Sequence, residues 1–397
     1  MTMTHNFALA LLFALSIAIT GSYDLSAEDA SLSWKVIPLA VDANEGIDIA
    51  DFDGDGKLDI CAGRFWYRNP EFRAQPVRSI EDFGNGYVES NGDFAYDVNK
   101  DGKMDIIAGS FIPSTVHWFE NPGNEKLRLG LLWKKHLLVD TKASQNEGQL
   151  MADINGDGVP EWLVNSWGKD TPFYAWSLSS TVPDGTPSLS KHVIGERGNG
   201  HGMGVGDITG DGHVDLLTGN GWYENPGPPY FGKPWRYHKD WAVHGAVPML
   251  VYDVNADGKN DVIYAAGHDF GLSWWENKGN KEGTVEFEHH EIDKSISQQH
   301  ALHLADITGD GKPELITGKR YYAHNGGDTG AKDPIEICYF VINTTNASFK
   351  KHSISTGRIG IGLQIRTDDI NADGKLDIAV AGKSGTYILL NQGTVSK

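Results

Sequence analysis

Cysteine and long apolar segments are almost absent from this chain. Among its 397 residues only Cys61 and Cys338 are cysteines, and the repeat pattern described below places them in units that do not touch. We therefore expect two buried thiols and no disulfide. The one long apolar run covers residues 7–20, and no later segment is apolar and long enough to cross a bilayer.

Basic residues are also in deficit, because 34 Lys and Arg stand against 53 Asp and Glu, giving a formal net charge of −19. An acidic chain repels a phosphate backbone, so we expect no nucleic acid partner. The sequence also lacks a phosphate-binding loop, a dinucleotide fingerprint and a nucleophile motif. Nothing therefore points to a nucleotide cofactor or to covalent catalysis.

Residues 1–27 differ from the rest of the chain. The early apolar run, followed by the small residue Ala27, predicts a cleaved signal peptide, although the segment before the run carries only His5 and the amino terminus as basic groups. The alternative is an uncleaved anchor, which would be the only membrane contact. In either case we expect a secreted or periplasmic protein.

One acidic pattern dominates the remaining sequence. The pattern Asp-x-(Asp/Asn/Thr)-x-Asp-Gly-x-x-(Asp/Glu) returns seven times, and its copies begin at Asp51, Asp97, Asp153, Asp207, Asp253, Asp306 and Asp369. The copies recur about every 53 residues, and each unit carries four short apolar or aromatic runs, which is typical of a propeller blade. The 48 glycines suit the many turns, and the 12 tryptophans suit packing between blades. The sequence therefore predicts an all-β protein, a seven-bladed β-propeller with four-stranded antiparallel blades, formed by residues 33–391 as one domain.

The last unit is one strand short. The outer strands of the first six units are expected at 77–81, 133–139, 189–194, 235–241, 287–292 and 349–354. The seventh unit ends with its third strand at 387–391, whereas a spare strand, 33–39, precedes the first acidic loop. We predict that this N-terminal strand completes the last blade, because a ring with an open sheet edge would invite aggregation.

The acidic loops have the composition of calcium sites. Their alternating oxygen ligands, with glycines that permit a tight turn, suit a hard cation as in the first half of an EF-hand loop. The predicted ligands are Asp51, Asp53, Asp55, Asp59, Asp97, Asn99, Asp101, Asp105, Asp153, Asn155, Asp157, Glu161, Asp207, Asp211, Asp215, Asp253, Asn255, Asp257, Asp261, Asp306, Asp310, Glu314, Asp369, Asn371, Asp373 and Asp377. Thr209 and Thr308 replace the second ligand in two loops, which we expect to bind more weakly. We predict up to seven structural calcium ions, which would bring the net charge to about −5.

These loops resemble the FG-GAP/VCBS repeats found in the integrin alpha-subunit propeller and in many exported bacterial proteins. The likeness covers residues 33–391 and implies a calcium-stabilised seven-bladed propeller. That repeat family contains both adhesion modules and enzymes, so the resemblance implies no particular activity.

An aromatic motif recurs in the third strands. It reads Trp-Tyr-Arg-Asn-Pro from Trp66, Trp-Phe-Glu-Asn-Pro from Trp118, Trp-Tyr-Glu-Asn-Pro from Trp222 and Trp-Trp-Glu-Asn from Trp274. Carbohydrate stacking is one interpretation, but the position before a turn favours packing between blades. Histidines of the outer strands, such as His136 and His238, are expected to be solvated, whereas His303 inside a first strand is expected to be buried.

The chemically unusual residues gather on the face opposite the acidic loops. His201 and His300 each stand six residues before an acidic loop, where other units carry Glu45, Asn91 and Glu147. A group of further residues follows neighbouring strands, namely His244, His268, Lys319, Arg320, Tyr321, Tyr322, His324 and Arg358. We predict a ligand site at this mouth of the channel, with His201, His300, His268, Arg320 and Tyr321 as candidate catalytic residues. Because they lie at an opening, we expect replacements of His201, His300 and Arg320 to change stability by only ~0.5 kcal/mol.

Arg320 and Lys319 are expected to pair with a ligand's carboxylate or hydroxyls, while the histidines move protons or bind an additional divalent metal. The segments 200–204 and 299–302 resemble parts of the propeller in aldos-2-ulose dehydratase and in propeller-type polysaccharide lyases. That likeness implies β-elimination from a sugar.

Two functions therefore stay open. The favoured one is a calcium-stabilised binding module without enzymatic activity, acting on a glycan or an extracellular protein. The alternative is a carbohydrate lyase or dehydratase. The two differ in whether the imidazoles of His201, His268 and His300 converge within ~4–6 Å.

Overall fold

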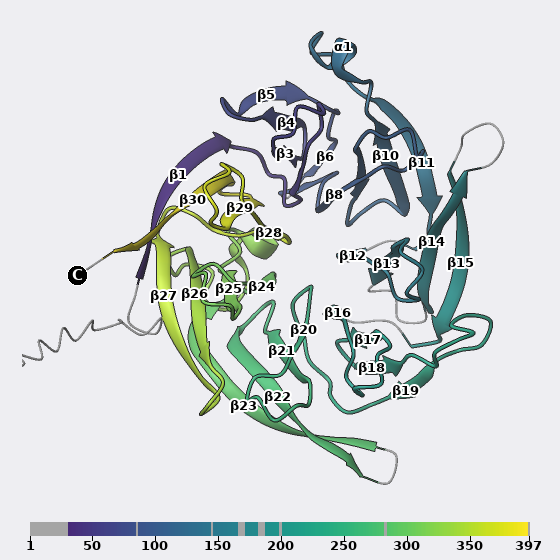
Figure 1. The fold of residues 1–397 in the computed structure, drawn as a ribbon, viewed down its shortest axis with the longest axis vertical. Helices are drawn as coiled ribbons and strands as arrows, with labels where there is room; N and C mark the ends of the chain where they lie inside the picture. Colours follow the sequence, from purple (N-terminus) through teal and green to yellow (C-terminus); the bar gives the residue numbers. More distant parts are fainter. Residues whose placement is uncertain are drawn as a thin grey trace, which may run out of the picture.

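Seven four-stranded sheets surround one axis. The computed structural model describes residues 31–84, 86–143, 146–165, 171–181, 187–197, 201–281 and 284–395. Figure 1 shows the sheets arranged radially like blades, and every sheet is antiparallel. The predicted seven-bladed β-propeller is confirmed. The predicted signal peptide at 1–27 lies outside the described residues, and none of the described helices is long and apolar enough to span a membrane.

Blades follow the chain order, and the first strand of each lies nearest the axis (Figure 1). Blades one to three comprise β2 (Asp48–Ala50), β3 (Asp59–Ala62), β4 (Phe65–Arg68) and β5 (Arg73–Pro76); β8 (Gly92–Tyr96), β9 (Asp105–Gly109), β10 (Thr115–Glu120) and β11 (Lys134–Asp140); and β12 (Gly148–Ala152), β13 (Glu161–Asn165), β14 (Phe173–Thr181) and β15 (Pro187–Gly195). Blades four and five comprise β16 (Met203–Gly206), β17 (Asp215–Thr218), β18 (Gly221–Glu224) and β19 (Arg236–His238); and β20 (Leu250–Tyr252), β21 (Asp261–Ala265), β22 (Phe270–Lys281) and β23 (Thr284–Ser297). Blades six and seven comprise β24 (Leu302–Ala305), β25 (Glu314–Gly318), β26 (Glu336–Asn343) and β27 (Ser348–Thr356); and β28 (Ile365–Asp368), β29 (Asp377–Gly382), β30 (Gly385–Val395) and β1 (Ser31–Ala40). Outside the blades lie β6 (Asp82–Gly84), β7 (Tyr87–Val88), helix α1 (Asn124–Leu127) and the 3-10 turn η2 (Ala323–Gly326).

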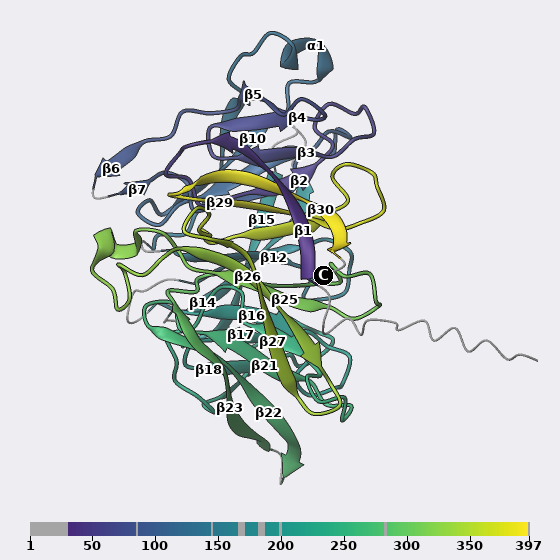
Figure 2. The same cartoon turned by 90° about the vertical axis from the view of Figure 1, so that its left-hand side faces the viewer.

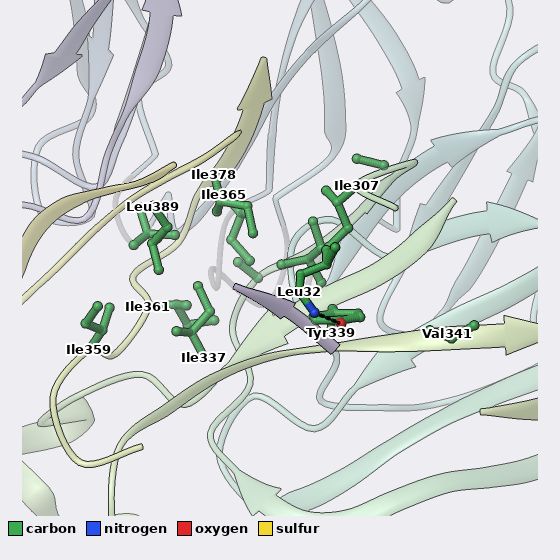
Figure 3. Packing of buried hydrophobic residues seen from close by; sticks show 14 residues of the cluster. Leu32, Ile307, Ile337, Tyr339, Val341, Ile359, Ile361, Ile365, Ile378 and Leu389 are labelled. Atoms are coloured by element: carbon green, nitrogen blue, oxygen red, sulfur yellow. Dashed lines mark hydrogen bonds between the residues drawn. The ribbon is translucent and has the colours of Figure 1, made fainter. Parts of the chain in front are cut away.

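The N-terminal strand closes the ring, as predicted. Strand β1 pairs antiparallel with β30, with Trp34 opposite Asn391 and Ile37 opposite Ile388. Its first residues also reach the preceding blade, because Leu32 N donates to Tyr339 Oη at 3.2 Å. Figure 3 shows Leu32 among the apolar side chains that join blades six and seven. The last blade therefore has no free edge.

The outer strand of the first blade differs from the prediction at 77–81. The observed strand, β5, ends at Pro76 because the chain turns back sooner than expected. Phe72 adopts a positive φ of 49°, and its N–H donates to Arg68 O at 2.7 Å. This tight turn places β5 immediately after β4, and Val77 N then donates to Arg64 O.

The third-strand tryptophans pack between blades. Trp66, Trp118, Trp222 and Trp274 are all at most 3% exposed, so the packing interpretation is confirmed and carbohydrate stacking at these residues is excluded. Both cysteines are buried free thiols, as expected.

The outer-strand histidines are less solvated than predicted. His136, His238 and His290 lie flat on the rings of Trp118, Trp222 and Trp274, with centroids 4.1–4.6 Å apart. Each also contacts a glutamate of its third strand, as His238 Nε2 does with Glu224 Oε2 at 2.7 Å. His238 is only 7% exposed. The prediction of solvated edge residues is wrong for these positions because each faces a tryptophan across the strand pair.

His303 lies at the junction of blades six and seven. Its Nε2 contacts Thr367 Oγ1 at 2.8 Å, and burial lowers its pKa from 6.5 to about 4. A histidine with a lowered pKa stabilises the folded state above pH 6.5, and this contribution is lost as the pH falls towards 4. The span corresponds to on the order of 3 kcal/mol.

We expect His303→Gln, which keeps a donor for Thr367 but cannot titrate, to reduce the loss of stability between pH 7 and pH 4. Urea unfolding of parent and variant across this range measures the difference. Parallel pH profiles would show that His303 is not the titrating group.

Candidate functional site

Two elements mark the face opposite the acidic loops. The hairpin of β6 and β7 joins blades one and two, and η2 follows the second strand of blade six. Figure 2 shows β6, β7 and the green turn η2 on the same side of the molecule. We call this side the mouth of the channel.

The residues directly before the first strands line this mouth. Glu45, Asn91, Glu147, His201 and His300 occupy equivalent positions in five blades, and all are at most 7% exposed. Because each first strand runs beside the axis, one position per blade is brought towards the centre. The structure thus gathers polar side chains that are far apart in the sequence.

Four histidines meet at this centre. The ring centroid of His201 lies 4.4 Å from that of His244, 4.7 Å from that of His268 and 5.2 Å from that of His300. His268 and His300 have centroids 4.7 Å apart. The imidazoles of His201, His268 and His300 therefore converge, as the lyase or dehydratase hypothesis requires.

Hydrogen bonds fix the orientation of three of these rings. His201 Nδ1 contacts Gly245 O, and His300 Nδ1 contacts Gln298 O at 3.2 Å. A carbonyl oxygen only accepts, so both Nδ1 atoms carry hydrogen. His268 Nδ1 likewise donates to Asp328 Oδ2 at 2.9 Å. In the neutral form, all three rings then have their lone pair on Nε2.

These Nε2 atoms face one another and a carboxylate. His201 Nε2 lies 3.2 Å from His268 Nε2 and 3.3 Å from Glu147 Oε2. Within the described part of the chain, the buried Nε2 of His300 has no hydrogen-bond partner. Electron pairs at these distances repel one another unless a positive charge, either a proton or a metal ion, lies between them.

Burial and neighbouring charges favour protonation states in which the cluster can bind a cation. Burial, then the charges of His201 and His268, lower the pKa of His244 to about 4. Burial also lowers the pKa of His268 and of His300. Burial alone would raise the pKa of Glu147, but His201 and Arg320 outweigh it and hold that pKa well below its usual range. At neutral pH the imidazoles of His244, His268 and His300 are therefore neutral and lie near an ionised carboxylate.

Arg320 does not face a ligand, contrary to the prediction. Its Nε and Nη2 donate to both oxygens of Glu45 at 2.6 Å, and its Nη1 donates to Glu147 Oε1 at 2.8 Å. The side chain is 3% exposed, and its two carboxylate partners raise its pKa against the effect of burial. Lys319 is also buried and donates to Gly330 O. Neither cation is available for a ligand's carboxylate.

Of the other predicted residues, His324 adjoins the cluster and the two tyrosines are exposed. Tyr321 and Tyr322 are 44% and 49% exposed, with ring centroids 6.0 Å apart. His324 stacks on His268 with centroids 4.2 Å apart, and both rings contact Asp328. Asp328 had not been predicted, although it lies only four residues after His324.

The acidic loops form a separate set of sites. In the first loop, oxygens of Asp51, Asp53 and Asp59 lie within 4.8 Å of one another. Asp51 also accepts from Gly54 N, Asp55 N and Gly56 N, which holds the turn. Among the residues that the structure describes, the buried Asp53 Oδ1 has no hydrogen-bond partner. Burial raises the pKa of Asp59 to about 7. Three of the four ligands predicted in this loop are thus brought together.

Comparison with known proteins agrees with the repeat pattern. Residues 97–164 and 253–317 match the family model described as FG-GAP-like repeat. These two segments are therefore similar to FG-GAP-like repeats. No curated protein matches the sequence significantly. Among solved structures, an exotype rhamnogalacturonan lyase, YesX, aligns with a TM-score of 0.50 and 14% identity over 90% of this chain and 73% of that one. BBS1N, solved in complex with ARL6DN, aligns with a TM-score of 0.51 and 10% identity over 90% of this chain and 96% of that one. At these identities the neighbours establish the propeller fold alone.

The burial of Arg320 changes the expected effect of its replacement. Removing the guanidinium leaves Glu45 and Glu147 buried without compensation, which typically costs 3–5 kcal/mol. We expect Arg320→Ala to destabilise the protein by about that amount, far beyond the ~0.5 kcal/mol typical of exposed positions. Urea unfolding measures the difference.

Arg358, which is exposed, provides the matched control. Arg358→Ala should unfold with the parent. An Arg320→Ala protein as stable as this control would contradict the structural role.

Proposed function

We propose that the protein binds a divalent transition metal ion at the mouth of its channel and cleaves or dehydrates an acidic carbohydrate there by β-elimination. The observation that carries the proposal is the position of His201, whose Nε2 lies 3.2 Å from that of His268 and 3.3 Å from Glu147 Oε2, with the ring centroid of His300 5.2 Å from its own. Packing alone gives no reason to bring four imidazoles into contact, because the buried rings of His201 and His300 lose hydration.

The residues fit a metal ion. Ligand nitrogens at ~2.1 Å from zinc in tetrahedral geometry stand ~3.4 Å apart, and the two Nε2 atoms of His201 and His268 are 3.2 Å apart. The Nδ1 contacts with Gly245 O, Gln298 O and Asp328 are the outer hydrogen bonds that orient metal-ligating imidazoles. Glu147, His201 and His300, whose ligand atoms lie within 4.8 Å of one another, would hold the ion. His268, whose Nε2 lies 3.2 Å from that of His201, would be a further ligand. When bound, it would supply a Lewis acid for an oxygen of the sugar.

His244, the remaining histidine of the cluster, can accept a proton from the substrate. His244 is the exposed member of the cluster, and its pKa of about 4 keeps it neutral at pH 7. It is placed to accept the proton alpha to a sugar carboxyl or carbonyl group. As that C–H bond breaks, its electron pair forms a C=C bond and the bond to the oxygen on the β carbon breaks. The departing oxygen then takes up the proton that His244 has accepted, either directly or through water. The fold of the YesX lyase supports the same conclusion only as an analogy.

The non-enzymatic alternative differs in its products. A binding module for a glycan or an extracellular protein would use the same mouth without changing its ligand. Nothing in the cluster geometry favours it, because recognition of a neutral glycan needs no set of facing imidazole lone pairs. We therefore prefer the lyase or dehydratase.

Metal loading and product formation test this proposal together. Metal-free protein titrated with cobalt(II) should take up one equivalent at the cluster and show visible absorption bands of a nitrogen-ligated ion. The cobalt- or zinc-loaded protein should then release unsaturated, ultraviolet-absorbing products from one of a set of acidic polysaccharides. His268→Ala should lose both signals.

The control variant is His289→Ala, which removes an exposed imidazole from the outer strand of blade five. It should keep both the cobalt spectrum and the product signal. Failure of the parent to bind cobalt would overturn the metal site. Binding without any unsaturated product would overturn the eliminase and leave a binding module.

We further propose that the seven acidic loops bind calcium as structural ions in an exported protein. Support comes from the carboxylates of Asp51, Asp53 and Asp59, which converge around the unpartnered Asp53 Oδ1. Calcium sites of extracellular modules bind with Kd values of ~0.1–1 mM, so millimolar calcium contributes on the order of 1 kcal/mol per site.

A calcium-selective chelator should accordingly lower the melting temperature by on the order of 10 °C. Calorimetry with and without calcium measures the shift. Asp51→Asn should lose the calcium-dependent stabilisation of about one site, and it serves as a partial control. An unchanged melt, together with metal analysis that detects no calcium, would refute the proposal.

A further inference from the structure

The mouth needs a cation that can reach a ligand. The sequence indicates Lys319 and Arg320 for this role, but both are buried. Lys319 donates to Gly330 O, and Arg320 is held by Glu45 and Glu147. An acidic sugar beside Glu147 would meet an ionised carboxylate and would need a compensating positive charge. The mouth therefore needs another basic group that a ligand can reach.

Lys383 is such a group. It lies in the turn between β29 and β30 of blade seven, on the mouth side of the sheet. The adjoining Ser384 Oγ accepts from Gly360 N at 3.0 Å, which fixes the turn. The Lys383 ammonium lies 5.2 Å from the ring centroid of Tyr87 in the β6–β7 hairpin. A Cβ at Gly86 would lie 3.4 Å from both the Lys383 Nζ and the Asn325 Oδ1, so the hairpin tip meets both residues.

Lys383 is not used to balance the buried charges. In the part of the chain that the structure describes, Lys383 makes no hydrogen bond or ion pair with Glu45, Glu147 or Arg320. Their charges act on the pKa of Lys383 only at a distance. The carboxylates of Glu45 and Glu147 are already held by Arg320. The ammonium is half-buried and its hydration is reduced, which strengthens any charge-assisted hydrogen bond that it makes.

Aromatic groups adjoin this ammonium. Tyr87 stacks on Phe111 with centroids 5.5 Å apart and planes 21° apart. Both rings line a small pocket whose lining also includes Glu147 and Arg320, and Glu147 contacts His201 of the histidine cluster. Stacked rings beside a polar pocket are a surface on which the apolar face of a sugar can lie.

We infer that Lys383 and Tyr87 form an anion subsite that takes the carboxylate of a uronic acid residue and holds it beside the histidine cluster. This inference rests on the proposed function and deepens it, because it names the group that recognises the acid. Lys383 thereby replaces Arg320 and Lys319 as the specificity-determining cation.

Paired ligands and paired variants test the subsite. Calorimetric titration compares digalacturonate with its methyl ester, which has the same sugar ring but no carboxylate charge. For Lys383→Gln, we expect binding of the acid to weaken roughly 10- to 100-fold, the usual weight of a charge-assisted hydrogen bond, and binding of the ester to change less than about twofold. Lys383→Arg should retain most of the affinity. Lys35→Gln removes the same charge from an exposed position of β1 in the same blade and should bind as the parent does.

The outcomes separate this inference from the proposed function. Equal binding of the acid by parent and Lys383→Gln would overturn the subsite, as would equal losses for acid and ester or a parent that prefers neither. Lys383→Gln should leave the cobalt spectrum unchanged. Binding of the acid that depends on Lys383, without unsaturated product, would instead retain the subsite and reject the elimination.

Discussion

The arrangement of the mouth depends on one ion network that spans three blades. Arg320 belongs to blade six, yet its guanidinium holds Glu45 before blade one and Glu147 before blade three. Removing three charges from water is costly, and the planar fork of donors recovers this cost only while both carboxylates stay in place. The second oxygen of Glu147 then faces His201. The network thus positions the histidine cluster as well as closing the centre of the ring.

Much of the fold could be predicted because repeated local sequence patterns specify it. The seven acidic loops established the number of blades, and the missing last strand identified residues 33–39 as its completion. The site could be predicted only in part. The shared position before the first strands indicated His201 and His300, and it also marked Glu45 and Glu147 without revealing their role. The pairing of Arg320 with Glu45 joins residues 275 positions apart, and no local pattern shows which charges of two blades will face each other. For the same reason Lys383, in a two-residue turn, carried no signal in the sequence.

The acidic loops also connect neighbouring blades through an asparagine that the sequence motif contains. The buried last acid of a loop accepts from the backbone N–H of this asparagine, as Asp105 Oδ1 does from Asn121 N at 2.7 Å. The asparagine Nδ2 then donates to a carbonyl of the preceding blade, as Asn121 does to Phe52 O at 2.8 Å. The same pair of contacts recurs at Asn69, Asn225, Asn277 and Asn391. In blades three and six the acid is a glutamate, and it accepts from Ser177 Oγ or Thr308 Oγ1 instead. Glutamate in place of aspartate looks conservative in the sequence, yet it marks the two blades in which this connection differs.

The closure by β1 has a kinetic consequence. Blade seven draws its outer strand from the start of the described chain and its other three from the end, so its sheet cannot form until β28, β29 and β30 have been synthesised. Until then the first six blades expose an unfinished ring with apolar surfaces at both open sides, and contacts of such sequence separation form slowly. The pairing of β1 with β30 is therefore the step that completes the ring, and a chain that has not yet made it exposes these surfaces to other chains.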